Sequence, residues 1–189
     1  MKKYIAATAI ILLFLGLSNQ ALANRYKAGF SVNYYKPSDS NFKEPYRAGN
    51  MMFGLSLGIN LLKRFEFRGE LNYFRVKGEM TLSKEEITYI FTPLVAGLRY
   101  KVFKAGRIGP YLGLGADLCS YKEKVPERYG KVSGSKIGLH GEIGTLVKLA
   151  ERFHLDINVR YLYVFNKSLN GIEREFGGLR AGIGIEFLF

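Results

Sequence analysis

Strict alternation over the last eleven residues constrains this chain more than any other sequence feature. Apolar side chains recur at every second position, with small or charged residues and one leucine between them. Successive side chains of a β-strand lie on opposite faces, so this period of two predicts a strand with one apolar face. We expect this final strand to pair with the first one and so close a barrel. The apolar positions are Leu179, Ala181, Ile183, Ile185, Phe187 and Phe189.

The same alternation recurs along the rest of the chain and marks eight segments in all. Each has the length of a strand and is bounded by residues that favour turns and loops. Eight such segments and no long helical pattern predict an all-β fold. The segments span residues 26–36, 51–62, 65–76, 89–103, 107–121, 135–149, 152–165 and 178–189.

The connections between these segments alternate strictly between short and long. Short turns on one side, long polar loops on the other and an even number of strands are typical of an outer-membrane barrel. The pattern predicts an eight-stranded antiparallel up-and-down transmembrane β-barrel. The short connections are 62–64, 104–106 and 150–151, and the long ones are 37–50, 77–88, 122–134 and 166–177.

The two faces of the predicted strands differ in polarity. One face is apolar, and the other carries the charged residues and most of the strand glycines, among them Gly97, Gly113 and Gly115. A soluble lipocalin-like barrel would turn the apolar face inward, whereas a membrane barrel turns it toward lipid. The interior of an eight-stranded barrel has room for little more than side chains, so glycines would relieve crowding there. On a soluble surface they would only weaken the strands, and the glycines therefore favour the membrane barrel.

In that orientation the charges facing the lumen balance, because bases and acids occur in equal number besides one histidine. An unpaired buried charge is strongly destabilising, so we expect the charges to form a salt-bridge network that fills the lumen. A narrow pore for small solutes is the alternative. The predicted network comprises Glu66, Arg68, Glu70, Arg99, Lys101, Asp117, Lys136, His140, Glu142, Asp156, Arg160, Arg180 and Glu186.

The first residues have the three parts of an export signal. Lys2 and Lys3 precede an apolar run over residues 5–17, and Ala21-Leu22-Ala23 follows it as a cleavage site with small residues. A membrane-spanning helix needs about 20 apolar residues, so the run is too short for an anchor. We therefore expect residues 1–23 to be a cleaved signal peptide and residues 24–189 to form the barrel domain.

Two internal motifs and the ending carry a family resemblance. Residues 110–115 read Pro-Tyr-Leu-Gly-Leu-Gly, residues 97–100 read Gly-Leu-Arg-Tyr, and the chain ends in Phe187-Leu188-Phe189. Together with the strand pattern, they resemble the small outer-membrane barrels that include the transmembrane domain of outer membrane protein A, outer membrane protein X and the opacity adhesins. The resemblance implies that the protein lies in the outer membrane of a Gram-negative cell.

The resemblance also implies partners. In the membrane they are outer-membrane lipids and lipopolysaccharide. During biogenesis they are periplasmic chaperones and the barrel-assembly machinery, which would read Phe187 and Phe189 as a C-terminal signal.

Residues capable of chemistry do not form a recognisable active site in the sequence. His140 and His154 both lie on the inward phase without a His-x-Ser pattern, and we expect each to be hydrogen-bonded beside Glu142 or Asp156. No paired metal ligands, phosphate loop or nucleophile elbow appears, and the single Cys119 builds no zinc site. The formal charge of +12 is spread over strands and turns, without the basic arm or helix of a nucleic-acid binder. We predict no enzymatic activity, cofactor, metal or nucleic acid; a lipid A-modifying enzyme is the alternative.

The long connections and strand ends are the remaining candidates for function. Tyrosines near strand ends, including Tyr34, Tyr35, Tyr73 and Tyr121, predict aromatic girdles at the membrane interfaces. Aromatic and basic residues in the connections suit lipopolysaccharide phosphates and host or surface ligands, with folding back onto the barrel rim as the alternative. The predicted function is therefore structural or surface interaction. The candidate contacts are Phe42, Tyr46, Lys124, Arg128, Tyr129 and Phe176.

Overall fold

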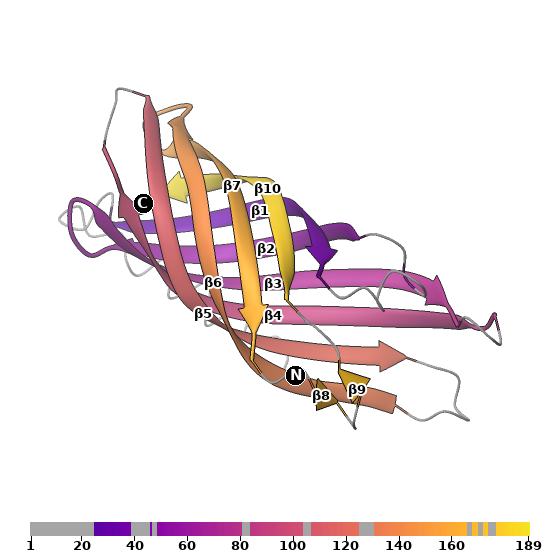
Figure 1. Cartoon of the computed structure of the whole chain (residues 1–189). Coiled ribbons are helices and arrows are strands. Elements are labelled where there is room, and N and C mark those ends of the chain that lie inside the picture. Colours follow the sequence, from indigo (N-terminus) through magenta and orange to yellow (C-terminus); the bar gives the residue numbers. More distant parts are fainter. Residues whose placement is uncertain are drawn as a thin grey trace, which may run out of the picture.

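Eight antiparallel strands close into a barrel, in the order β1-β10-β7-β6-β5-β4-β3-β2 (Figure 1). This computed structural model describes residues 25–38, 46, 49–80, 84–103, 107–124, 131–165, 168–169, 172–173 and 177–189. Among those residues, no helix is long and apolar enough to cross a membrane. The barrel strands are β1 (Tyr26–Pro37), β2 (Asn50–Asn60), β3 (Phe65–Glu79), β4 (Glu86–Lys101), β5 (Ile108–Lys124), β6 (Lys131–Lys148), β7 (Phe153–Val164) and β10 (Gly178–Leu188), and a small hairpin pairs β8 (Ser168–Leu169) with β9 (Ile172–Glu173).

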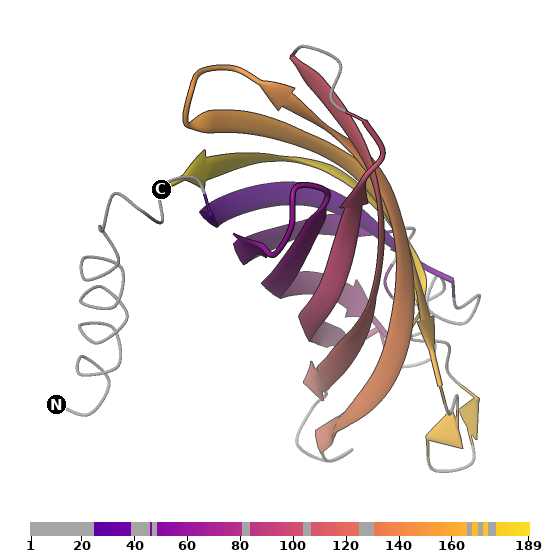
Figure 2. The same ribbon diagram turned by 90° about the vertical axis from the view of Figure 1, so that its left-hand side faces the viewer.

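The last strand closes the barrel against the first, as the alternation predicts. Strands β1 and β10 pair from Lys27 opposite Leu188 to Pro37 opposite Gly178, and Figure 2 shows these indigo and yellow strands side by side. The amide of Phe189 donates a hydrogen bond to the carbonyl of Tyr26 over 3.1 Å, and their rings stack with centroids 6.3 Å apart. Closure leaves the described barrel without a free sheet edge.

The apolar faces point outward and the charged faces point inward. Leu57, Leu98 and Ile157 are 52%, 49% and 43% exposed, whereas Glu66 and Arg99 are 0% and 2% exposed. A soluble barrel would have the opposite pattern, so the membrane orientation is confirmed. The glycines face inward as expected: a Cβ on Gly115 would lie 2.5 Å from the His140 ring and one on Gly113 3.3 Å from Glu142.

Two of the long connections are shorter than the sequence predicts. Strand β3 continues to Glu79 and β4 begins at Glu86, while β5 continues to Lys124 and β6 begins at Lys131. About half of each expected loop, 77–88 and 122–134, is therefore strand. Figure 1 shows these two hairpins extending to the right, well past the ends of β1 and β2. The strands of these hairpins stay paired beyond the last outward-facing apolar residue. The hydropathy pattern therefore does not predict this extension. Short turns mark the periplasmic end, so the extension lies on the extracellular side.

Candidate functional site

A layer of ion pairs crosses the periplasmic half of the lumen, between strands β1, β3, β4, β6, β7 and β10. All of its side chains except that of Lys101 are buried. The strand period of two directs each of them inward from its own strand, and closure of the barrel brings them together. We call this set the charged layer; it comprises Lys27, Glu66, Arg68, Glu70, Arg99, Lys101, Glu142, Asp156, Arg160, Arg180 and Glu186.

Arg99 is the centre of the charged layer. Its guanidinium donates to Glu142 Oε1 over 2.7 Å, to Asp156 Oδ2 over 2.9 Å and to Glu186 Oε1 over 3.0 Å. Its Cζ lies 4.2 Å from the ring centroid of Tyr111, whose hydroxyl donates to Asp156 Oδ1 over 2.7 Å. One side chain from β4 thereby joins carboxylates from three other strands.

The remaining arginines extend the charged layer toward the extracellular end of the barrel. Arg160 donates from Nε to Glu142 Oε2 over 2.7 Å and from Nη2 to Glu70 Oε2 over 3.1 Å. Arg180 donates to the other oxygen of Glu70 over 2.5 Å. Arg68 pairs with Glu186 and lies 3.5 Å from Glu70 Oε2. Most members therefore have two or more partners of opposite charge.

Lys27 belongs to the charged layer although the sequence analysis did not include it. Its ammonium lies 2.7 Å from Glu66 Oε2 and 3.0 Å from Glu186 Oε2, and its side chain is buried. Lys101 joins the same carboxylate of Glu66 at 3.2 Å. The signal was present, because Lys27 lies two residues from Gly29 on the same strand, on the phase that carries glycines and charged residues.

His140 pairs with Asp117, not with Glu142 or Asp156, so the expected partner was wrong. The two buried side chains share a hydrogen bond through His140 Nδ1. Gly97 and Gly115 lie against the other edge of the imidazole ring. A Cβ built on Gly97 would lie 3.3 Å from Nε2. His154 is also wrongly assigned: its buried Nδ1 has no hydrogen-bond partner among the described residues.

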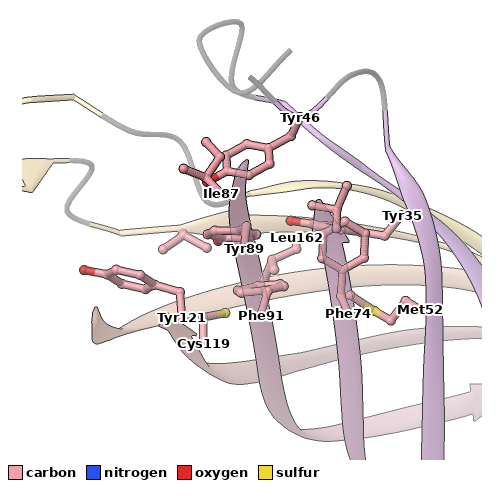
Figure 3. Packing of buried hydrophobic residues seen from close by; sticks show 12 residues of the cluster. Tyr35, Tyr46, Met52, Phe74, Ile87, Tyr89, Phe91, Cys119, Tyr121 and Leu162 are labelled. Carbon is pink, nitrogen blue, oxygen red and sulfur yellow. The ribbon is translucent and has the colours of Figure 1, made fainter. Parts of the chain in front are cut away.

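An aromatic and aliphatic layer fills the lumen above the charged layer, and the sequence analysis missed it. Tyr35 stacks on Phe91 with ring centroids 5.5 Å apart and meets Phe74 edge-on at 5.2 Å, and Figure 3 shows these rings converging from different strands. We call this cluster the aromatic layer; it comprises Tyr35, Tyr46, Met52, Phe74, Val76, Ile87, Tyr89, Phe91, Cys119, Tyr121, Leu162 and Val164.

Two expectations are corrected by the aromatic layer. Tyr35 and Tyr121 point into the lumen and are 3% and 5% exposed, whereas Tyr34 and Tyr73 do face outward, as a girdle requires. Lys136 lies opposite Cys119 in the register and is half-buried, at the level of the aromatic layer and not in the charged layer.

Tyr46 is buried and does not form an exposed loop contact, so that expectation was wrong. Its side chain is 2% exposed, its hydroxyl donates to Glu123, and its ring lies 5.7 Å from that of Tyr89. Figure 3 shows it descending onto the aromatic layer from above. Lys124 lies in strand β5, where it is exposed. The other candidate contacts, Phe42, Arg128, Tyr129 and Phe176, lie outside the described residues.

A basic cavity of about 730 Å³ opens at the periplasmic end of the lumen. Lys27 and Lys101 line it, so the charged layer forms its inner limit. Further out, its wall includes Arg25, Arg107 and Lys148. Where the charged layer meets the aromatic layer, a cavity of only about 20 Å³ lies between Arg160 and Phe91. Among the described residues, no cluster of three His, Cys, Asp or Glu side chains could hold a metal ion.

Comparison with known proteins agrees with this geometry. The model of the family described as "Outer membrane protein beta-barrel domain" matches residues 6–187. A search of curated proteins found no match.

Three solved structures have a similar fold. Neisserial surface protein A is 17% identical with a TM-score of 0.66, covering 87% of this chain and 97% of its own. OprG from Pseudomonas aeruginosa is 16% identical with a TM-score of 0.67, covering 89% and 97%. Ail, the attachment invasion locus protein of Yersinia pestis, is 14% identical with a TM-score of 0.54, covering 88% and 99%. The closed eight-stranded barrel and the family match together identify this chain as an outer-membrane β-barrel protein of the outer membrane protein β-barrel domain family.

Proposed function

We propose that this protein is a closed outer-membrane barrel that conducts no solute and acts through the surface that it presents outside the cell. The observation that carries the proposal is the filling of the lumen by two successive layers, one ionic and one aromatic. An eight-stranded barrel has an interior just wide enough for side chains, and here large side chains occupy both levels. The extended hairpins β3–β4 and β5–β6 then offer a surface beyond the membrane.

The similarity to Ail supports this proposal, because the name of that barrel refers to attachment and invasion. It supports only the class of function, since the identity is low and one fold serves many roles. We accordingly place the interaction surface on this chain's own extension and not on residues matched to Ail.

Planar-bilayer recording of the purified barrel tests the closed lumen. We expect no steady current steps from the wild-type protein, because both layers would have to part before ions pass. The combined replacement Tyr35→Ala and Phe91→Ala removes two rings from the aromatic layer and leaves the charged layer intact. We expect the charged layer to keep that variant silent as well. Reproducible open channels in the wild-type protein would overturn the proposal and favour a narrow pore that starts at the basic cavity.

Lipid analysis separates the proposal from an enzyme that modifies lipid A. The buried His140–Asp117 pair supports a structural role, since glycine and not a hydroxyl faces its outer nitrogen. We expect the mass of lipid A to be unchanged when the protein is overexpressed in a Gram-negative host. His140→Ala and His154→Ala should alter only the heat stability of the barrel. A new lipid A species that disappears in either variant would contradict the proposal.

A further inference from the structure

The outward-facing side chains of β3 and β5 change from apolar to basic toward the extracellular end. Both strands carry exposed apolar residues at the level of the bilayer, and each then carries two exposed basic residues on the same face. The order along β3 is Leu71, Tyr73, Arg75 and Lys77, and along β5 it is Leu118, Ser120, Lys122 and Lys124. We call Arg75, Lys77, Lys122 and Lys124 the basic shoulder.

The dimensions of the strand place the basic shoulder at the outer membrane surface. The outward apolar stretch of β5 runs from Ile108 to Leu118, which spans about 25 Å along the membrane normal at about 3.3 Å per residue and a tilt of about 40°. That is about the height of the apolar band of a transmembrane barrel. Lys122 follows Leu118 by about 10 Å, where the headgroups begin. Lysine and arginine are long enough to reach charges just above the hydrocarbon while their stems lie along it.

The four cations are neighbours across the sheet. Arg75, Ile90 and Lys122 are opposite one another in successive strands, and so are Lys77, Thr88 and Lys124. Strands lie about 4.8 Å apart, so each row holds two cations within roughly 10 Å.

One ion pair neutralises part of the basic shoulder. Lys77 lies 2.7 Å from Glu86 Oε1, and its hydrogen bond holds the pKa of that carboxyl below its ordinary value. The charge of Arg75 also acts on Glu86, and the exposed Glu79 follows Lys77 on the same face. Among the described residues, the side chains of Lys122 and Lys124 form no ion pair with a carboxylate, so four cations face two carboxylates. An anion approaching from the side therefore meets a net positive surface.

The opposite wall of the barrel lacks this feature. At the extracellular ends of β7, β10, β1 and β2, most of the described outward positions are apolar or aromatic, such as Tyr163, Leu179, Tyr34 and Met51. Lys36 is the single basic residue among them. The concentration of charge is thus confined to one sector, directly above the leucines of β3 and β5.

We propose that the basic shoulder binds the phosphates of lipid A, the phosphorylated glycolipid anchor of lipopolysaccharide. An amphiphile with acyl chains and phosphates matches an apolar stripe that ends in exposed cations. A soluble polyanion has no acyl chains that could contact the stripe. The inference rests on the position in the outer membrane and not on the closed lumen. A conducting barrel would leave it intact.

Native mass spectrometry of the purified barrel with added lipid A tests the proposal. The probes are bisphosphorylated lipid A, monophosphoryl lipid A and a phosphate-free glycolipid with the same acyl chains. We expect retention to fall in that order, and to fall with rising salt. The variant Arg75→Gln with Lys122→Gln should bind bisphosphorylated lipid A about tenfold more weakly, since each cation near an anionic surface contributes measurably.

Lys36→Gln is the matched control, because it removes an exposed cation at the same level of the opposite wall. It should bind like the wild type, and a heat-modifiable gel band checks that every variant is folded. Equal binding by the double variant and the wild type would overturn the proposal. So would equal losses in the double variant and the control. Competition by a sulfated glycan that matched lipid A would instead make the basic shoulder a site for soluble polyanions, which also overturns it.

Discussion

The charged layer and the aromatic layer fill the same lumen by different physics. In the charged layer, each side chain satisfies several fixed partners, as Arg99 does with Glu142, Asp156 and Glu186. In the aromatic layer, rings such as Phe91 pack against several neighbours without fixed partners, apart from the edge and stacking preferences of aromatic pairs. Removing one ion leaves its buried partners without a counter-charge, whereas removing one ring leaves a cavity.

The boundary between the two layers follows the solvent outside the barrel. Beside the charged layer, the outer face carries leucines that meet hydrocarbon. On β3 and β5, the outer face beside the aromatic layer carries Arg75 and Lys122, while Phe74 and Tyr121 point inward. Each of these strands therefore changes from apolar-out to apolar-in at the membrane surface, and the extension is built like a soluble barrel. The same chain obeys one rule, that apolar groups avoid water, in two surroundings.

Replacing Arg99 by Ala should have the largest effect on stability. It leaves three carboxylates buried without their shared cation, and removing one member of a buried ion pair costs about 3 to 5 kcal/mol. We expect the free energy of unfolding to fall by about 5 kcal/mol, measured by urea unfolding in lipid vesicles.

Arg64→Ala is the control for Arg99, because Arg64 is exposed and, within the described part of the chain, its side chain donates only to the Tyr100 hydroxyl. It should cost less than about 1 kcal/mol. The second variant Arg99→Met keeps the volume and should be nearly as damaging as Arg99→Ala. If Arg99→Met were as stable as the wild type, the charged layer would be packing alone and the contrast between the layers would fail.

Replacing Phe91 by Ala should have the next largest effect. Its ring is fully buried between Tyr35 and Tyr89, and such truncations cost about 3 kcal/mol or more. In contrast to Arg99→Met, the apolar change Phe91→Leu refills part of the space and should recover most of the loss. Unfolding in urea measures both variants. Equal losses for Phe91→Ala and Phe91→Leu would indicate that specific ring contacts, and not filling of space, hold the aromatic layer together.

Much of the fold follows from the sequence because lipid imposes a simple pattern. The eight strands, their order and the inward direction of Arg99 and Glu142 could be predicted, since every outward residue in hydrocarbon must be apolar. The choice of partners could not be predicted, because the barrel brings together residues far apart in the chain. His140 was assigned to the wrong acid for this reason: Asp117 lies on the neighbouring strand, and the sequence gives no measure of which inward carboxylate is nearer.

The aromatic layer was missed for a different reason. In segments such as Tyr73-Phe74 and Ile90-Phe91, both phases are apolar, so alternation no longer distinguishes the two faces. Tyr46 was assigned to the exposed loop contacts because it lies in an otherwise polar connection, and only its burial and its bond to Glu123 reveal its role. Loss of alternation near a basic residue was the available signal that a strand had left the membrane.

Gly115 lies beside the His140–Asp117 pair, and its replacement tests how tightly the lumen is packed there. A Cβ on Gly115 would lie 2.4 Å from the carbonyl oxygen of Ala96 and 2.5 Å from the His140 ring, so Gly115→Ala should cost about 2 kcal/mol. The outward Gly141 is the matched control, since its Cβ would meet only Leu114 at 3.9 Å. Thermal shifts of the two variants measure the difference. A stable Gly115→Ala barrel would mean that the lumen has spare room there.

Removing the hydroxyl of Tyr46 should have the smallest effect of the set. Tyr46→Phe keeps the ring against Tyr89 but deprives the Glu123 carboxylate of a donor, which costs about 1 kcal/mol. The outward Tyr73→Phe serves as control, because Tyr73 is 46% exposed and makes no comparable buried bond among the described residues. Urea unfolding should separate the two variants. If Tyr46→Phe were as destabilising as Phe91→Ala, the polar bond and not ring packing would hold the top of the aromatic layer, and the two layers would differ less than their composition suggests.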